Sequence, residues 1–241
     1  MKLKIRILIY PFLMLMVVIL SSGTFRNNMT KNTETNNNPT PATGTVTDKE
    51  GNIYKTVTLG KQIWMAENLK TTKYRNGDPI PAVTVNSNWA ALTTGGFCWY
   101  NNDAAANKAT YGALYNWYAV NDPRNIAPSG WHVPSDEEWT VLANFLAGKS
   151  QAGGKLKETS TSHWSDPNSG ATNSSGFTAL PGGYRNKDGV FKNLSFCGTW
   201  WATTEYTKSV AWYRYVDYGT STIYNVSTYK TSGFSIRCIK D

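Results

Sequence analysis

Hydrophobic and polar residues alternate over short stretches through most of the chain after about residue 44. The segment GTVTDKEGNIYKTVTLGKQIWMAENL places β-forming residues between glycine-containing turn signals. This pattern predicts a short strand, a second strand near Ile53–Leu59 and a third near Gln62–Met65. Further along, Phe97–Tyr100 has the character of a buried strand, and Ser87 is positioned to cap one turn of helix through Leu92.

The stretch GWHVPSDEEW, residues 130–139, predicts the main helix of the chain. Trp131–Val133 is a strand candidate that ends at a proline. Ser135, followed three residues later by Glu138, forms a capping-box pattern. Apolar residues then recur on one helical face, so we expect a helix over about Asp136–Ala147 that ends at Gly148.

The region after residue 153 has almost no helical periodicity. Loops rich in Gly, Ser and Asn lead into six apolar runs, namely FTALPGGYR, GVFKNLSF, GTWWATTE, AWYRYVDY, STIYNVST and GFSIRCIKD. Their spacing is typical of an antiparallel sheet built from hairpins. We therefore predict an α+β domain of short antiparallel strands with one main helix and long loops.

The N-terminal region predicts export. Three basic residues precede an apolar run over Ile7–Leu20, and small residues follow it up to Gly23. This is the pattern of a secretory signal over residues 1–23, and an uncleaved anchor is the alternative. Residues 24–43 are rich in Asn, Thr and Pro, which predicts a disordered linker before a single domain at 44–241. We expect an extracellular or cell-surface protein, with the outer membrane or periplasm as alternatives and membrane contact only through an uncleaved N-terminal segment.

Charge argues against a nucleic-acid partner. The formal net charge is +8, and Lys2, Lys4 and Arg6 supply three of these charges. The other basic residues are scattered among Tyr, Thr and Asn, without the clustered stripe that follows phosphates.

The cysteines and histidines give no catalytic constellation. In an exported chain, Cys98, Cys197 and Cys238 permit one disulfide and one remaining thiol, and the sequence leaves the pairing open. None lies in a CxxC motif or beside His132 or His163 at ligand spacing, so we expect neither structural zinc nor a Cys/His nucleophile. We expect His132 to be a core or turn histidine.

Several ordered motifs resemble one bacterial family. WMAENLKTTKY, CWYNNDAAANKATYGALYNWYAV, GWHVPSDEEW, GGKLKE, GFTALPGGYR, WWATTE and GFSIRC together look like the Fibrobacter succinogenes major paralogous domain (FISUMP), from about residue 45 to the C-terminus. GWHVPSDEEW and GFSIRC are also similar to segments of formylglycine-generating enzymes. The resemblance implies a C-type-lectin-like fold and exported or surface-attached relatives, but fold kinship does not transfer activity.

Two departures from these relatives bear on function. Formylglycine-generating enzymes use a cysteine pair shortly before the final strand, and the matching stretch of this chain has none. Relatives of the domain often carry a cysteine where Ala127 stands, so Cys238 lacks that partner. We therefore expect no catalytic residue, and an enzyme with altered chemistry on that scaffold is the alternative.

Aromatic residues are the most prominent compositional feature, with ten Trp and fourteen Tyr. Pyranose rings stack on aromatic faces, while polar side chains bind their hydroxyls. This chemistry predicts carbohydrate binding or adhesion near the last strands, with a glycan or a surface protein as partner. The predicted site residues are Trp201, Glu205, Trp212, Tyr213 and Arg214. Because neighbouring strand residues point to opposite faces, at most one of the adjacent tryptophans at 200–201 can face the ligand. The alternative for the rings is that most of them build the core. A structural unit of a surface assembly is a separate alternative for the function.

Two oxygen-rich segments are candidate Ca²⁺ ligands, at Asn101–Asp103 and Asp166–Asn168. Turn formation explains both segments equally well. No cofactor is required by the sequence, and Ca²⁺ stays an option.

Overall fold

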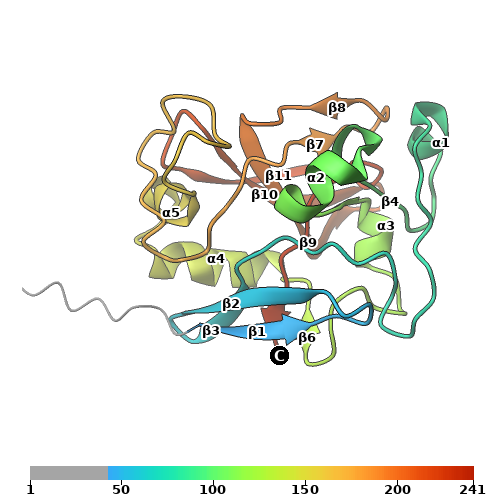
Figure 1. The fold of residues 1–241 in the computed structure, drawn as a ribbon, viewed down its shortest axis with the longest axis horizontal. Helices are drawn as coiled ribbons and strands as arrows, with labels where there is room; N and C mark the ends of the chain where they lie inside the picture. Colours follow the sequence, from blue (N-terminus) through green and yellow to red (C-terminus); the bar gives the residue numbers. More distant parts are fainter. Residues whose placement is uncertain (1–42) are drawn as a thin grey trace, which may run out of the picture. The chain divides into compact units, whose positions relative to one another are not determined.

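The computed structural model describes residues 43–241, and the predicted signal and nearly all of the predicted linker lie outside these residues. The first sheet is antiparallel, with the strand order β1-β2-β3-β12-β6 (Figure 1). Its strands are β1 (Thr43–Thr47), β2 (Ile53–Leu59), β3 (Gln62–Met65), β12 (Ile239–Lys240) and β6 (Trp131–His132). The bounds of β2 and β3 confirm the predicted second and third strands.

A second antiparallel sheet, of order β11-β10-β9, carries the candidate site. Its strands are β9 (Cys197–Thr207), β10 (Val210–Asp217) and β11 (Ile223–Tyr229). Two short ladders complete the β structure, β4 (Phe97–Cys98) with β5 (Leu114–Tyr115), and β7 (Tyr184–Arg185) with β8 (Phe191–Lys192).

The helices of the described residues are short. They are α1 (Asn86–Ala90), the 3-10 helix η1 (Tyr100–Asn102), α2 (Ala104–Tyr111), α3 (Trp117–Val120), α4 (Asp136–Phe145) and α5 (Lys149–Leu156). The capping box at the start of α4 is confirmed, because Ser135 Oγ accepts from the Glu138 amide and the Glu138 side chain accepts from the Ser135 amide. The predicted cap Ser87 is wrong, since it lies inside α1, which begins after Val85 with no side-chain cap.

Helix α5 was not expected, and its glycines explain why. Gly153 and Gly154 lower helix propensity and leave no apolar stripe to recognise. In the structure a Cβ on Gly153 would overlap the backbone of Thr222, and one on Gly154 would overlap the backbone of Gly170. The glycines therefore allow the helix to pack directly against two loops, so "one main helix" understates the helical content.

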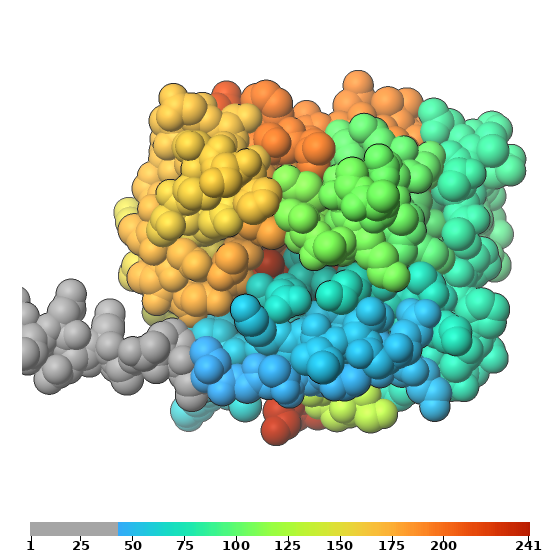
Figure 2. All heavy atoms as spheres, viewed as in Figure 1, coloured from blue at the N-terminus to red at the C-terminus, as the bar shows by residue number. Residues whose placement is uncertain are grey.

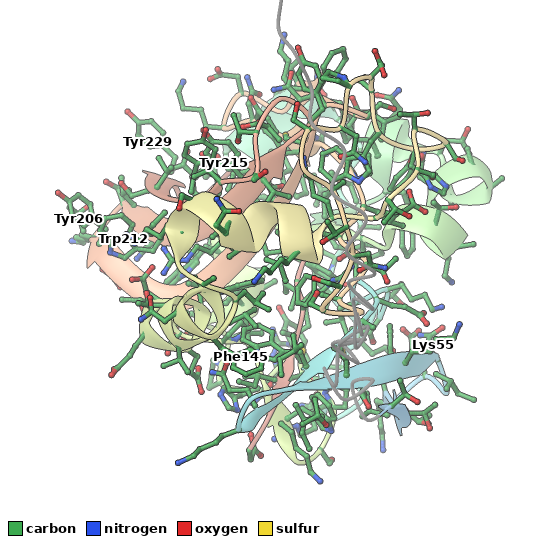
Figure 3. The ribbon with its side chains drawn as sticks, turned by 90° about the vertical axis from the view of Figure 1, so that its left-hand side faces the viewer. Lys55, Phe145, Tyr206, Trp212, Tyr215 and Tyr229 are labelled. Carbon is green, nitrogen blue, oxygen red and sulfur yellow. The ribbon has the colours of Figure 1, made fainter. Side chains whose placement is uncertain are left out.

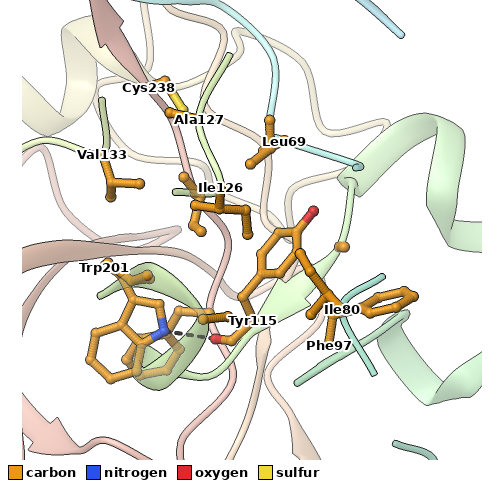
Figure 4. Close-up of a cluster of buried hydrophobic side chains, with 14 of the residues drawn as sticks. Leu69, Ile80, Phe97, Tyr115, Ile126, Ala127, Val133, Trp201 and Cys238 are labelled. Atoms are coloured by element: carbon orange, nitrogen blue, oxygen red, sulfur yellow. Dashed lines mark hydrogen bonds between the residues drawn. The ribbon is translucent and has the colours of Figure 1, made fainter. Parts of the chain in front are cut away.

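The core is largely aromatic. Trp64, Trp139 and Trp200 meet around Phe177, with ring centroids between 4.7 and 6.2 Å apart. A second cluster includes Trp201, whose indole nitrogen donates to the carbonyl of Tyr115 at 2.7 Å (Figure 4). Most of the large rings therefore build the domain interior, as the alternative interpretation of the aromatic residues expected.

The described chain is mostly β, with a curled antiparallel sheet and few helices (Figure 1). The C-type-lectin-like scaffold stays a prediction from resemblance. Within residues 43–241, no helix has both the length and the apolar character needed to cross a membrane.

Candidate functional site

A cavity of about 570 Å³ opens on one face of the β9-β10-β11 sheet. Segments far apart in sequence form it, because the β7–β8 hairpin and the turn before Phe234 close over the three strands. Its aromatic lining is Tyr184, Tyr213, Tyr215, Tyr229 and Phe234. Its polar lining is Asn186, Lys187, Asp188, Asn193, Thr199, Thr228 and Ser232, and Cys197 and Val226 complete it.

Strand alternation decides which side chains reach this cavity. Tyr213 and Tyr215 lie two residues apart on β10 and project to the cavity face. Trp212 and Arg214 alternate with them and project to the opposite face, where Arg214 meets helix α4. The cavity face and the helix-covered face of one sheet are therefore built from interleaved residues.

The tyrosines of the cavity floor stack on one another. Tyr215 is opposite Tyr224 across the β10–β11 ladder, and their rings lie 4.5 Å apart at an interplanar angle of 10°. Along the same strand, the Tyr213 ring lies 6.1 Å from that of Tyr215 at 27°. Phe234 packs at 4.5 Å from Tyr213 and at 5.7 Å from Tyr184. The rings form a row that is stacked from Tyr224 through Tyr215 to Tyr213, tilted between Tyr213 and Phe234, and edge-to-face between Phe234 and Tyr184.

Three tyrosine hydroxyls of this row, those of Tyr184, Tyr213 and Tyr215, remain protonated and are free to bind a ligand. Burial is the main cause that raises the pKa of Tyr213, and it also raises the pKa of Tyr184 and of Tyr215. Within residues 43–241, none of these three hydroxyls hydrogen-bonds to a protein group, whereas the Tyr224 hydroxyl lies 3.3 Å from Thr220 Oγ1. At neutral pH the cavity therefore offers neutral phenol hydroxyls that can each donate and accept.

The rim of the cavity is polar. Lys187 and Asp188 pair with each other at 2.6 Å in the turn between β7 and β8. Lys187 Nζ also lies 5.6 Å from the ring centre of Tyr229, which is half exposed (Figure 3). Asn186 accepts from the amides of Asp188 and Val190, which fixes this turn. The rim is thus ordered by its own hydrogen bonds and has no net charge.

Cys197 contributes a thiol to the lining, and burial raises its pKa to about 12. A thiol of this kind stays protonated at neutral pH and is a poor nucleophile. Cys98, Cys197 and Cys238 are all buried and free, so none of the three possible disulfides is formed.

The structure separates the five predicted site residues. Tyr213 lines the cavity. Trp201 is fully buried below it, with its indole nitrogen bound to a backbone carbonyl, so its place in a ligand site must be corrected. Arg214 is 2% exposed and pairs with Asp136 at 2.9 Å, so its guanidinium is committed to helix α4.

The two remaining predicted residues lie away from the cavity lining. Trp212 packs on the opposite face against Tyr206, with ring centroids 4.9 Å apart, and Figure 3 shows this pair near the end of the β9–β10 hairpin. Glu205 pairs with the buried Lys230 at 3.0 Å. Neighbouring residues 212, 213 and 214 cannot converge on one ligand from a regular strand.

The sequence prediction missed most of the cavity. Tyr215 could have been found from Tyr213, because residues i and i+2 share a strand face. Tyr184 and Tyr229 could not, since they reach the cavity through tertiary packing of the β7–β8 hairpin and the end of β11.

A second hollow is visible in the face drawn in Figure 2, where segments near residues 66–70, 109–112 and 178–180 meet above the C-terminal strand region. Its volume is about 210 Å³, and Arg237 forms part of its lining. Burial lowers the pKa of Arg237 to about 9, and its guanidinium donates to Asn68 and to the carbonyls of Phe177 and Thr178. These bonds tie the loop before β7 to the core, so the cation serves packing.

The two predicted Ca²⁺ segments are engaged in local structure. Asp103 caps helix α2 by accepting from the Ala106 amide at 3.0 Å, and Asn168 donates to the carbonyls of Glu158 and Ser160. Among residues 43–241, no cluster of three or more His, Cys, Asp or Glu side chains is suited to a metal ion.

Comparison with known proteins gives one match. The profile of the Fibrobacter succinogenes major domain matches residues 57–240, which include the whole β9-β10-β11 sheet and every residue of the cavity lining. No curated protein and no solved structure matches the chain. Because the match covers well over half of the sequence, the chain belongs to the Fibrobacter succinogenes major domain family.

Proposed function

We propose that this protein is an exported binding module that holds a glycan in the tyrosine-lined cavity of the β9-β10-β11 sheet. The observation that carries the proposal is the set of three uncommitted tyrosine hydroxyls, of Tyr184, Tyr213 and Tyr215, at one cavity of about 570 Å³. Polar groups that converge in a concave, partly aromatic pocket are typical of ligand sites.

The groups around the cavity favour binding over catalysis. Acid–base chemistry at neutral pH uses a group whose pKa lies near the working pH. The phenols and the Cys197 thiol have raised pKa values, and the carboxylate of Asp188 is paired with Lys187 at the rim. A binding role therefore explains this lining with fewer assumptions than an enzyme on a formylglycine-generating scaffold.

Cavity filling tests the binding proposal directly. Val226 lines the cavity between the tyrosines, and Val226→Trp fills space without removing a polar group. In a glycan array probed with the purified full chain, we expect the wild type to bind and Val226→Trp to lose binding. Val141→Trp, at an exposed position of α4, is the matched control. Absence of glycan binding by the wild type, or equal binding by Val226→Trp, contradicts the proposal.

Export is tested on the protein as cells produce it. The basic and apolar N-terminal residues support a signal with cleavage after Gly23. N-terminal sequencing of protein recovered outside the cytoplasm should then begin at Thr24. An intact Met1 in the membrane fraction supports the anchored alternative, and recovery only from the cytoplasm contradicts export.

A further inference from the structure

We infer that the cavity recognises an uncharged oligosaccharide through the hydroxyls and edges of its tyrosines, and not by stacking sugars on their faces. This inference rests on the proposed glycan-binding function and specifies the class of ligand and the way it is held. It is based on the arrangement of the rings, on the packing of their faces against other rings, and on the charge of the lining.

The central rings use their faces in contacts with one another. Tyr215 stacks on Tyr224 across the ladder, with centroids 4.5 Å apart at 10°, and packs on Tyr213 along its own strand, with centroids 6.1 Å apart at 27°. Tyr213 in turn packs on Tyr215 and on Phe234, whose ring lies 4.5 Å away at a tilt of 39°. A pyranose cannot enter between these rings without separating them. Offset and tilted aromatic pairs are themselves favourable, so such a separation has a cost.

The edges of the same rings are available. Side chains stand roughly perpendicular to a sheet, so rings that cover one another from strand to strand present their outer edges to the space above. The hydroxyls of Tyr213 and Tyr215 lie at those edges and have no protein partner among the described residues. Tyr184 adds a third such hydroxyl from the β7–β8 hairpin. A row of groups that both donate and accept is complementary to the hydroxyls of a sugar chain.

The charge of the lining favours a neutral ligand. Lys187 and Asp188 are its charged residues, and they neutralise each other at 2.6 Å on the exposed rim. The phenols stay protonated because burial raises their pKa values. A buried anionic or cationic ligand would need a compensating charge that the floor does not supply. Uronic acids and sulfated sugars therefore fit this cavity less well than uncharged hexoses or pentoses.

Phenylalanine substitutions separate edge recognition from face recognition. Tyr213→Phe and Tyr215→Phe keep each ring and remove only its hydroxyl. We expect each to weaken binding about fivefold, and the double variant about 25-fold, since a net hydrogen bond is worth about 1 kcal/mol. Tyr206→Phe, at an exposed tyrosine that packs against Trp212 on the opposite face, is the matched control and should bind like the wild type.

The measurement is isothermal titration of the full chain with neutral tetrasaccharides of glucose, mannose and xylose, and with tetragalacturonate as the acidic probe. Thermal unfolding of each variant shows whether the fold is retained. Wild-type affinity in the double Phe variant, or tighter binding of tetragalacturonate than of every neutral probe, overturns the inference while leaving glycan binding intact. If the wild type binds none of the probes and no glycan on an array, the proposed function itself fails.

Discussion

Cys238 and Ala127 are both buried in the same core cluster, and Figure 4 draws their side chains near each other; Ala127 is the position at which the family resemblance implies a second cysteine. We therefore expect Ala127→Cys to form a disulfide with Cys238. Closing the long loop between residues 127 and 238 should raise the free energy of unfolding by roughly 2–4 kcal/mol. Thiol titration of the denatured protein and thermal unfolding with and without reductant measure both effects.

Ala127→Ser is the control for this substitution, because it is close in size to cysteine and cannot form the bond. Wild-type protein has three free thiols. If Ala127→Cys shows one thiol more than the wild type and the same response to reductant as Ala127→Ser, the two side chains are not positioned for a bridge.

His132 connects the C-terminal residue to the start of helix α4. Its ring nitrogens lie 2.6 Å from Asp241 Oδ1 and 2.8 Å from Glu138 Oε1. Partial burial alone lowers the pKa of His132, but the hydrogen bonds and charges of the two carboxylates outweigh it, so the pKa is raised above 6.5. The imidazolium therefore stabilises the fold fully below pH 6.5, and this contribution is lost as the pH rises through the folded-state pKa.

The corresponding pH dependence can be measured by urea unfolding of wild type and His132→Gln. We expect the free energy of unfolding of the wild type to exceed that of His132→Gln by more at pH 5.5 than at pH 8.5. Because the side chain is 36% exposed, the change should be less than about 1 kcal/mol. A difference between the two proteins that is the same at both pH values shows that the ion pairs do not contribute.

At the scale of single residues, the sequence could point to Tyr213, but it could not show whether the neighbouring side chains are exposed or buried. Trp201 and Arg214 have side chains typical of sugar sites, yet both are buried and bonded within the protein. Trp201 hydrogen-bonds to the carbonyl of Tyr115 and Arg214 pairs with Asp136, and both partners are distant in sequence. Side-chain type predicts what a residue can bind, and only tertiary contacts decide whether it is free to do so.

The start of α4 shows how much one element gains from a cap. Ser135 Oγ accepts from the Glu138 amide at 3.2 Å, and Glu138 Oε2 accepts from the Ser135 amide at 2.8 Å. We expect Ser135→Ala to lower the free energy of unfolding by about 1 kcal/mol. Ser150→Ala, at an exposed position inside α5, should change it by less than about 0.5 kcal/mol. Chemical denaturation checks both, and equal losses contradict a specific role for the cap.

Elements with two independent signals were predicted well. Helix α4 has both a capping box and an apolar face, and β2 and β3 have alternation bounded by turns. Helix α5 has neither signal, because the packing of its glycines against neighbouring loops is invisible in a single sequence. The final apolar run gives a strand of only two residues, β12, since only Ile239–Lys240 pair with β3 and β6.

At the scale of the whole molecule, the cavity forms where separate hairpins of the chain pack together. Strands β9, β10 and β11 supply its floor, and the β7–β8 hairpin supplies its rim. Spacing along the chain gives the hairpins but not how they face one another. The sequence therefore pointed to the sheet on which the cavity lies and could not define the cavity itself.

Lys157 shows how the long loops are held to this assembly. The residue is fully buried after the end of α5, and its ammonium donates to three backbone carbonyls. These are the carbonyls of Ser169 at 2.9 Å, Asp217 at 2.8 Å and Thr220 at 2.8 Å. We expect Lys157→Met to lower the free energy of unfolding by about 3–5 kcal/mol, because it leaves these acceptors without a donor.

Lys149→Met, at the exposed first residue of α5, is the matched control and should stay within about 0.5 kcal/mol of the wild type. Urea unfolding of the two variants gives the comparison. Comparable stability of Lys157→Met and Lys149→Met would falsify the anchoring role.

Three carbonyl oxygens around one positive charge resemble the coordination shell of a bound cation, and here the charge is covalently part of the chain. A bound ion has a dissociation constant and can be removed by dilution or by a chelator, whereas the Lys157 ammonium always travels with the protein. The loops joined at this point are thus held equally well in ion-poor and ion-rich surroundings.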